Sequence, residues 1–305
     1  MQCDVVCIAS WNADLVSRVP RPIARGETLL ARSFEISPGG KGSNAAVACA
    51  RQGARTAVVA RIGRDEFGAM ALSLWQREGI ETAHVEQADG ERSGVAQILV
   101  FDDGDNSIAV APGAGAMLAA RHVDAAREAI AASRVVMASC EVPQAATLAA
   151  FRIAREAGAI TLLNPAPAQP LPDALLALTD VLTPNEAEVH ALAGDAGQAL
   201  DDAAAVLLAR GARAVLVTLG AAGCRLLRHD TPPVALAGWR VDHVVDTIGA
   251  GDTFTGALAA ALARGEPLEQ AMRCANAAAA LSVTGRGAIN GMPSLPQVLT
   301  RLAHS

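Results

Sequence analysis

The chain has 305 residues, of which 51% are apolar and 18% are charged, and its formal net charge is −6. This composition can bury a sizeable core and excludes an intrinsically disordered chain. The negative charge and the lack of a basic run argue against a nucleic-acid or anionic-membrane partner.

The cysteines and the N-terminal segment indicate where the protein works. Six cysteines are scattered without Cys-x-x-Cys spacing, which is typical of buried residues or free thiols in a reducing compartment. The first ten residues lack the basic segment and the long apolar run of a signal peptide. No apolar stretch approaches ~20 residues. We therefore expect a cytoplasmic protein without a membrane span.

The first predicted strand leads to the first candidate ligand side chains. Residues 5–9 form an apolar run that predicts a buried strand. Asn12 and Asp14 follow at its carboxyl end, where ligands bind in open α/β sheets. An aspartate there can accept hydrogen bonds from sugar hydroxyls, although an aspartate that forms a turn is the commoner case.

A glycine-rich turn at residues 37–44 precedes an Ala-rich helix that extends to Gln52. The turn reads Ser-Pro-Gly-Gly-Lys-Gly-Ser-Asn, and its glycines bring the backbone close to a ligand. Asn44, in the first helical turn, can point its amide the same way. Because such turns before helices are common, this motif alone is a weak signal.

A hairpin is predicted in the middle of the N-terminal half. Residues 93–101 and 107–111 read as strands joined by an Asp/Gly/Asn-rich turn. A calcium-loop interpretation of this turn fails, because the spacing is wrong and no glutamate closes the loop. With strands expected within residues 14–38, the segment 93–112 predicts a small β-lid that would exclude water from a site.

From residue 119 onward, helices and strands alternate regularly. This order predicts a mostly parallel sheet with helices on both faces. We find no internal repeat, linker or change of composition, and we therefore expect a single α/β domain over residues 1–305. The expected elements are a helix at 119–133, a strand at 135–138, a helix at 143–157 and a strand at 159–163.

Polar residues follow several of these strands. Glu141 lies beyond the strand at 135–138, where it is either a ligand or an acid favoured by a helix dipole. Asn185 and Glu188 share a helical face by their i, i+3 spacing and could coordinate a water-shelled magnesium ion. A plain capped helix start fits the same two residues. The glycine-bearing turn at 218–223 suits a nucleotide's phosphates or ribose.

The most informative motif is Asp-Thr-Ile-Gly-Ala-Gly-Asp-Thr-Phe at residues 246–254. It joins a strand expected at 241–245 to a helix expected at 253–263. Two glycines at such a junction leave backbone N–H groups free at the helix start, which favours bound anions. Asp252 at that positive end stays ionised and can accept a proton from a substrate hydroxyl.

The residues of this motif also fit a purely structural role. A helix N-cap and a close-packed turn would account for the same letters. No Gly-Lys-Ser/Thr follows, which excludes a Walker A loop, and the dinucleotide fingerprint is missing. Further on, Asn276 lies on a helix expected at 268–281. The glycine-rich loop 284–291 offers carbonyls that can ring a monovalent cation, although an ordinary surface loop is the default.

The motifs at 39–44 and 246–254 are similar to the two signatures of the ribokinase-like, phosphofructokinase-B type carbohydrate kinases. The segments 10–14, 141, 164–168, 183–188, 218–223 and 284–291 also appear in the order of this family. The resemblance implies a three-layer α/β/α sandwich with a mostly parallel sheet and a β-lid, through which a homodimer forms.

The implied activity is ATP-dependent phosphorylation of a sugar, D-ribose at its 5-hydroxyl, to D-ribose 5-phosphate. The alternative substrates are deoxyribose, fructose or a nucleoside. An alternative of another class is a non-catalytic sugar- or nucleotide-binding regulator, which has no need for Asp252. A dinucleotide-dependent oxidoreductase is third, disfavoured by the missing fingerprint.

The resemblance also implies roles for individual residues. Asp252 is the catalytic base, and the anion hole for the transferred phosphoryl group is formed by Gly249, Ala250 and Gly251. The sugar is held by Asn12, Asp14, Gly40, Lys41, Asn44, Glu141 and Asp252. ATP is bound by Asn185, Thr218, Leu219, Gly220, Ala221, Ala222, Gly223, Gly251 and Asn276. Glu188 organises Mg²⁺, and K⁺ lies on oxygens of Asp246, Ile248, Ser282, Gly285, Gly287 and Gly291.

Four positions depart from the family's pattern. Asn276 stands where histidine is common, and Gly291 stands where a serine often contributes to the cation site. Trp11 is bulkier than the usual small residue, and Gly115 replaces an asparagine. The last two are expected near the sugar, and they bear on which sugar is used.

Overall fold

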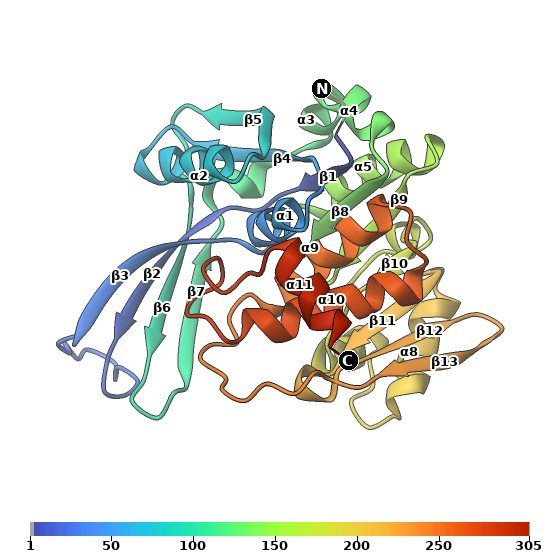
Figure 1. The fold of residues 1–305 in the computed structure, drawn as a ribbon. Helices are drawn as coiled ribbons and strands as arrows, with labels where there is room; N and C mark the ends of the chain where they lie inside the picture. Colours follow the sequence, from blue (N-terminus) through green and yellow to red (C-terminus); the bar gives the residue numbers. More distant parts are fainter. Residues whose placement is uncertain (1–2, 305) are drawn as a thin grey trace.

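The computed structural model describes residues 3–304 and contains two β-sheets (Figure 1). The larger sheet is formed by β1 (Val5–Ile8), β4 (Thr56–Gly63), β5 (Glu81–Ala88), β8 (Val135–Ser139), β9 (Ile160–Asn164), β10 (Val181–Leu182), β11 (Ala214–Thr218), β12 (Cys224–Arg228) and β13 (Thr231–Leu236). The smaller sheet is formed by β2 (Asn12–Arg18), β3 (Ser33–Gly39), β6 (Gly94–Val100) and β7 (Asn106–Ala111).

The order of the larger sheet is β13-β12-β11-β10-β9-β8-β1-β4-β5. Strands β5 to β11 pair in parallel, whereas β12 and β13 form an antiparallel edge. The chain passes from β1 outward to β4 and later returns to β8 on the other side of β1. This reversal makes a topological switch point, and ligands of α/β sheets bind at the carboxyl ends of the strands there.

Helices cover both faces of this sheet. One face carries α1 (Lys41–Arg51), α2 (Glu66–Arg77), α9 (Ala250–Ala263), α10 (Leu268–Ser282) and α11 (Leu295–Ala303). The other carries α3 (Ala120–Ala125), α4 (Arg127–Ala132), α5 (Gln144–Glu156), α6 (Asp173–Leu176), α7 (Glu186–Ala193) and α8 (Leu200–Ala209). Short 3₁₀ helices are η1 (Gly113–Met117) and η2 (Gly220–Ala222).

The alternation of side chains along β1 accounts for these layers. Val5 and Cys7 pack into the core beneath α1 and α9, whereas Val6 and Ile8 pack into the core beneath α5. Successive side chains of a strand point to opposite faces, so a strand buried on both faces is apolar throughout. The expected α/β/α sandwich is confirmed.

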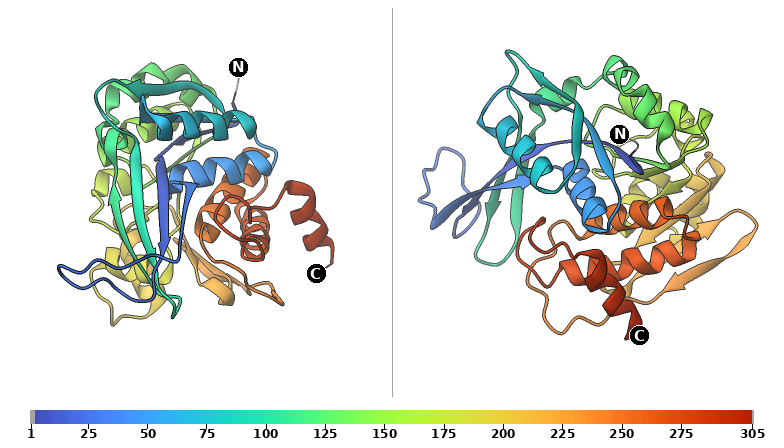
Figure 2. Two further views of the ribbon diagram at one scale, coloured as in Figure 1. Left: turned by 90° about the vertical axis from the view of Figure 1, so that its left-hand side faces the viewer. Right: turned by 45° about the horizontal axis from the view of Figure 1, so that its top comes forward.

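The smaller sheet, called the lid sheet below, has the order β3-β2-β6-β7 and stands off the larger sheet (Figure 2). Its strands come from the two segments in which the sequence predicts a lid. Strand β2 directly continues the connection that follows β1, so the lid sheet begins at the carboxyl edge of the larger sheet.

Three details differ from the sequence-based expectations. The strand expected at 241–245 is wrong: this segment is irregular, and the N–H of Val245 donates to the carbonyl of Val283 at 2.8 Å. The valines predicted a strand, but the sheet ends at β13 and offers no edge to pair with. The helix expected at 119–133 breaks at Ala126 into α3 and α4. Strand β5 was missed because this edge strand is largely polar.

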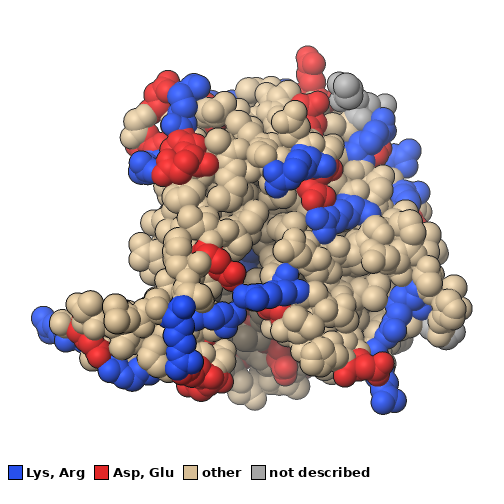
Figure 3. All heavy atoms as spheres, turned by 60° about the vertical axis from the view of Figure 1, so that its left-hand side comes forward, with Lys and Arg blue, Asp and Glu red and all other residues tan. Residues whose placement is uncertain are grey.

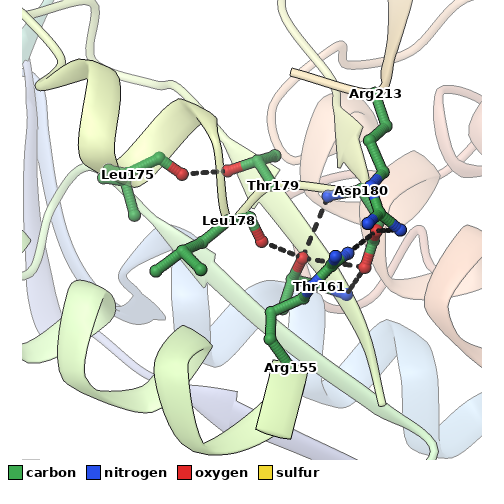
Figure 4. Close-up of polar contacts among 7 residues, drawn as sticks. All are labelled: Arg155, Thr161, Leu175, Leu178, Thr179, Asp180 and Arg213. Atoms are coloured by element: carbon green, nitrogen blue, oxygen red, sulfur yellow. Dashed lines mark hydrogen bonds and ion pairs between the residues drawn. The ribbon is translucent and has the colours of Figure 1, made fainter. Parts of the chain in front are cut away.

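An ion-pair cluster fixes the edge of the sheet opposite the switch point (Figure 4). Asp180, just before β10, accepts hydrogen bonds from the guanidinium groups of Arg155 and Arg213. It also accepts one from the backbone N–H of Thr161 at 2.9 Å. The cluster joins α5, β9, β10 and the segment before β11. It uses charged groups at the end of the sheet where no ligand is expected.

The described residues show no feature of a membrane or disulfide-bonded protein. No helix among them is long and apolar enough to cross a bilayer. All six cysteines lie buried and unpaired. On the face drawn in Figure 3, acidic and basic side chains of the described residues are interspersed rather than gathered by sign.

Helices α1 and α9 pack unusually closely, because α9 carries a glycine at the contact. A Cβ atom added to Gly256 would lie 2.3 Å from the carbonyl oxygen of Ala45 and 2.7 Å from the Cβ of Ala48. Both neighbours belong to α1, and they cannot move without shifting that helix. Glycine at 256 therefore sets the distance between the two helices.

We predict that Gly256→Ala lowers the free energy of unfolding by about 1–3 kcal/mol, because the added methyl group forces α1 and α9 apart. Urea unfolding followed by circular dichroism measures this change. Gly115→Ala is the matched control, since its nearest neighbour would be 3.8 Å away, and it should change stability by less than about 1 kcal/mol. Equal stability of both variants and the wild type would contradict this packing argument.

Candidate active site

The ends of β1 and β8 meet the start of α1 at the switch point. The hydroxyl of Ser10 donates a hydrogen bond to Glu141 Oε2 at 2.7 Å, and the backbone N–H of Lys41 donates to the same oxygen at 2.8 Å. Ser10 follows β1, and Glu141 follows β8. One carboxylate thus joins three elements that are far apart in the sequence.

The turn before α1 depends on Gly40, whose φ of 89° is in the left-handed region. A Cβ atom there would lie 2.8 Å from the Cα of Trp11 and 2.9 Å from the carbonyl oxygen of Ser10. Glycine is therefore required both for the backbone conformation and for the close approach of the turn to the end of β1. This approach brings Lys41 and Asn44 to the carboxyl edge of the sheet.

Asn44 and Asp252 form the central contact of the site. Asn44 Nδ2 donates a hydrogen bond to Asp252 Oδ2 at 2.8 Å, and each residue is only 6% exposed. The amide oxygen of Asn44 is buried and has no hydrogen-bond partner among the described residues. An unpaired buried acceptor is costly. A ligand hydroxyl that donates to this oxygen would remove the cost.

Acidic groups outnumber the basic group here, and their pKa values shift accordingly. Burial raises the pKa of Asp252 to about 6, against the opposing effects of Lys41 and Asn44. Burial, Glu141 and Asp252 together raise the pKa of Asp14 to about 7. Burial alone would lower the pKa of Lys41, but the surrounding carboxylates outweigh it and raise that pKa. The sequence predicted an ionised Asp252 but not this upward shift.

The glycine turn before α9 leaves donors open toward Asp252. Gly249 caps the helix with a φ of 77°, and the N–H of Ala250 donates weakly to the carbonyl of Thr247 at 3.3 Å. The N–H groups of Gly251 and Asp252 lie in the first turn and have no intrahelical acceptor. A Cβ atom at Gly251 would meet nothing within 4 Å. This open space in front of free donors can hold an anion.

Two adjoining cavities open on this turn. The first, of about 220 Å³, is lined by Lys41, Asn164, Ala166, Thr183, Asn185, Glu188, Thr218, Thr247, Gly249, Ala250, Gly251 and Asp252. The second, of about 530 Å³, is lined by Thr218, Gly220, Ala221, Gly223, Gly238, Trp239, Arg240, Val241, Val244, Thr247, Ala250, Gly251, Phe254, Asn276, Ala279, Ala280 and Val283. Thr218, Thr247, Ala250 and Gly251 line both cavities, so the anion turn lies between them.

Several candidate residues lie near the cavities without lining them. Asn12, Asp14, Gly40, Asn44 and Glu141 line neither one. Three of them are nevertheless tied to the smaller cavity: Asn44 bonds Asp252, Glu141 bonds Lys41, and Asp14 interacts electrostatically with both acids. Asn12 packs against Gly94 of the lid sheet, where an added Cβ would be 2.4 Å from the Asn12 side chain.

The nucleotide candidates divide in the same way. Thr218, Gly220, Ala221, Gly223 and Asn276 line the larger cavity, whereas Leu219 and Ala222 do not. Leu219 instead packs against the core beneath α8. Its position at the end of β11 made it a candidate, but its side chain points into the protein.

Asn185 and Glu188 satisfy both interpretations that the sequence left open. The side chain of Asn185 accepts a hydrogen bond from the N–H of Glu188, and Glu188 Oε2 accepts one from the N–H of Asn185, both at 2.8 Å. This reciprocal pair caps α7. Both residues also line the smaller cavity. The other oxygen of Glu188 accepts no hydrogen bond from the described residues.

The residues proposed for a monovalent cation come together around a closed loop. Asp246 accepts hydrogen bonds from the N–H groups of Ile248 at 3.0 Å and Gly287 at 2.9 Å. A Cβ atom at Gly291 would be 2.3 Å from the carbonyl oxygen of Ser282, and one at Gly285 would be 2.6 Å from the Cα of Gly291. Among the described residues, no cluster of three His, Cys, Asp or Glu side chains offers a metal site.

Sequence reasoning missed most of the apolar wall of the larger cavity. Trp239, Val241 and Val244 come from the segment that was expected to be a strand, whose side chains would have faced the core. Phe254 and Val283 had only an apolar pattern, which predicts core packing equally well. Thr247 lies inside the motif at 246–254 and could have been identified there.

Trp11 has a different role from the one expected. Its ring packs edge-on against Trp75, with ring centroids 5.8 Å apart, and it is 2% exposed. It lines neither cavity. The bulk of this side chain is accommodated in the core beneath α1 and α2 rather than beside the cavities.

Comparisons with known proteins agree with this geometry. The model of the pfkB family carbohydrate kinases matches residues 2–295. A ribokinase from Haemophilus influenzae is 38% identical over 100% of both chains. A deoxyribokinase from Salmonella typhi is 34% identical over 96% of this chain and 97% of the relative. The structure of Arabidopsis thaliana ribokinase complexed with ribose and ATP matches with a TM-score of 0.94, 32% identity and 100% coverage of both chains.

We predict that the Asp252 carboxyl group titrates near pH 6, because it is buried. Carboxyl-carbon NMR of the wild type, with Asp252→Asn identifying the signal, measures this value. Lys41→Met should raise the pKa further, because the lysine charge favours the ionised carboxylate. Arg64→Met removes an exposed charge elsewhere and should leave the pKa unchanged. An Asp252 carboxyl with an ordinary pKa would contradict the buried site.

Proposed function

The chain belongs to the pfkB family of carbohydrate kinases, and we propose that it is an ATP-dependent ribokinase that converts D-ribose to D-ribose 5-phosphate. The observation that carries this proposal is the position of Asp252. Its carboxylate is held by Asn44 from the sugar side and lies in the same helical turn as the open N–H of Gly251. A proton acceptor and an anion site are thus adjacent, as phosphoryl transfer requires.

In the proposed reaction, the 5-hydroxyl of the sugar donates a hydrogen bond to Asp252. As the hydroxyl oxygen bonds to the γ-phosphorus, the proton passes to this carboxylate, and the bond between the γ-phosphorus and the bridging oxygen breaks to release ADP. N–H groups of Gly251 and its neighbours would stabilise the charge on the migrating group. Lys41 lines the same cavity and adds a fixed positive charge.

The sugar would lie between the lid sheet and the switch point. Asn12, Asp14, Lys41, Asn44 and Glu141 gather there, and the unpaired amide oxygen of Asn44 offers an acceptor for a hydroxyl. Names of relatives support ribose, since ribokinases are 36–38% identical to this chain. The larger cavity would hold the adenosine part of ATP, with an apolar wall suited to the base.

Mg²⁺ and K⁺ are part of the proposal. Glu188 has a free carboxylate oxygen beside the anion turn, and Mg²⁺ is commonly bound through one carboxylate and substrate phosphates. When bound, it would neutralise charge on the phosphates. Asp246 and the loop formed by Ser282, Gly285, Gly287 and Gly291 supply oxygens for K⁺. The close approach of Gly291 to the Ser282 carbonyl supports this loop as an oxygen cage.

We further propose a cytoplasmic homodimer that forms through the lid sheet. Register pairs Asp14 with Ala96 and Ala96 with Val110, so Val110 shares the face of the lid that carries Asp14. Val110 and Ile108 are 51% and 56% exposed. A second copy that covers this face would close the sugar side to water. The six unpaired cysteines fit a reducing compartment.

Deoxyribose is the principal alternative substrate, because a deoxyribokinase is 34% identical to this chain. Fructose or a nucleoside would require a different set of contacts at Asp14 and Glu141. ADP release measured with a panel of pentoses, hexoses and nucleosides tests the proposal directly. The highest kcat/KM is expected for D-ribose. No ADP release with any of these would favour a non-catalytic sugar- or nucleotide-binding regulator.

We predict that Asp252→Asn lowers kcat by roughly 10²-fold or more, because the proton acceptor is lost. Ribose affinity should change only a few-fold, since the amide still reaches Asn44. Asp124→Asn, at an exposed ion pair, is the matched control and should retain wild-type turnover. Near-normal turnover of Asp252→Asn would remove this residue from the mechanism.

We predict that K⁺ raises kcat above the value measured with Na⁺, because the loop carbonyls are arranged for a large monovalent cation. Initial rates in potassium, sodium and choline salts at equal ionic strength measure this effect. Asp246→Asn should weaken the response, because its carboxylate closes the loop through Gly287. Equal rates in all three salts would discard the proposed cation site.

A further inference from the structure

The outer wall of the larger cavity is an irregular segment with few ties of its own. It runs from Gly238 to Val245, between β13 and α9, and contributes Trp239, Arg240 and Val244 to the lining. Gly238 N–H donates to the carbonyl of Ala222, and Val245 N–H donates to that of Val283. Between these two residues, no backbone N–H in the described chain donates to another backbone group. The wall therefore depends on side chains from elsewhere for its position.

One of these side chains is Arg301, from the C-terminal helix α11. Its guanidinium carbon lies 5.4 Å from the centroid of the Trp239 ring, and its Nη2 donates a hydrogen bond to the carbonyl of Arg240. A guanidinium over an indole face is an attractive contact. Arg301 thus holds both the ring and the backbone of the wall from the side opposite the cavity.

Helix α11 is itself fixed by the inner wall of the same cavity. It packs against α10 (Figure 1), and α10 supplies Asn276, Ala279 and Ala280 to the lining. Asn276 Nδ2 donates to the carbonyl of Ala237 at 2.9 Å, immediately before the irregular segment. Two helices therefore hold the outer wall at successive points, Asn276 at its start and Arg301 at its middle.

We propose that Arg301 is a positioning residue for the nucleotide. It does not line the larger cavity, but it fixes Trp239 and Arg240 in the geometry that the base and ribose of ATP contact. This inference rests on the proposed function, since it requires an adenine nucleotide in the larger cavity. A wall that must be ordered at binding costs affinity, and a wall already held by Arg301 avoids that cost.

The test compares nucleotide and sugar binding by the full-length protein. Isothermal titration calorimetry with ADP and Mg²⁺ should give a Kd for Arg301→Met that is raised roughly three- to tenfold, while the Kd for ribose stays at the wild-type value. Arg301→Lys retains a cation near the ring and should give an intermediate Kd. Arg273→Met removes an exposed arginine from α10 and should bind ADP like the wild type.

Tryptophan fluorescence provides a second measurement. Trp11 and Trp75 are buried against each other in the core, so a change on adding ADP reports Trp239. Arg301→Met should alter the Trp239 emission of the free protein and weaken its response to ADP. If Arg301→Met does not fold, Trp239→Leu, which leaves α11 intact, should show the same selective loss of ADP affinity.

The outcomes distinguish a failed function from a failed role for Arg301. Wild-type protein that binds no adenine nucleotide would overturn the proposed function and this inference with it. Normal ADP binding by both Arg301→Met and Trp239→Leu would overturn the inference alone. Equal loss of ADP and ribose affinity, with a lower Tm, would also overturn it, because Arg301 would then only anchor α11.

Discussion

The hydrogen bond from Asn44 to Asp252 joins the two halves of the site, and much of the surrounding structure serves to make it possible. Asn44 belongs to α1, which follows the lid, and Asp252 belongs to α9, more than 200 residues later. The helices approach closely enough because Gly256 leaves room for the backbone of Ala45. Gly40 brings the start of α1 to the end of β1. These two glycines thus set the geometry of one polar contact.

Burial gives this contact its chemical character. A carboxylate in a largely dry site loses hydration, and its pKa rises toward the range in which a proton acceptor works well near neutral pH. Lys41 opposes this rise and keeps Asp252 mainly ionised at pH 7. Meanwhile, the open N–H groups at the start of α9 provide a site for negative charge without any side chain. The switch point of the sheet brings these groups together, as it does in other open α/β folds.

The sequence was sufficient for the layers of the fold and for the residues of its two glycine motifs. Continuous apolar runs such as residues 5–9 identify strands buried on both faces, and glycines beside an acid identify a helix start built for an anion. It was insufficient where the same residues fit two structures. The valines at 241–245 fit a strand, but no sheet edge is free to pair with them. Asn185 and Glu188 fit both a cap and a metal site, and only the three-dimensional structure places them beside a cavity.

The nucleotide wall was the hardest part to predict, because its residues are distant in sequence and ordinary in type. Trp239 and Val244 gain their meaning only from α10 and α11, which hold the irregular segment against the cavity. A contact such as that between Arg301 and Trp239 leaves no periodic pattern. Such tertiary contacts determine side-chain roles that propensity and spacing do not encode.

The most direct test of the proposed mechanism is a crystal structure with ribose and a non-hydrolysable ATP analogue. We expect the 5-hydroxyl oxygen to lie within about 3 Å of an Asp252 carboxylate oxygen, with the γ-phosphate at the N–H of Gly251. A sugar hydroxyl bound away from Asp252, or a γ-phosphate held elsewhere than the turn before α9, would contradict the mechanism.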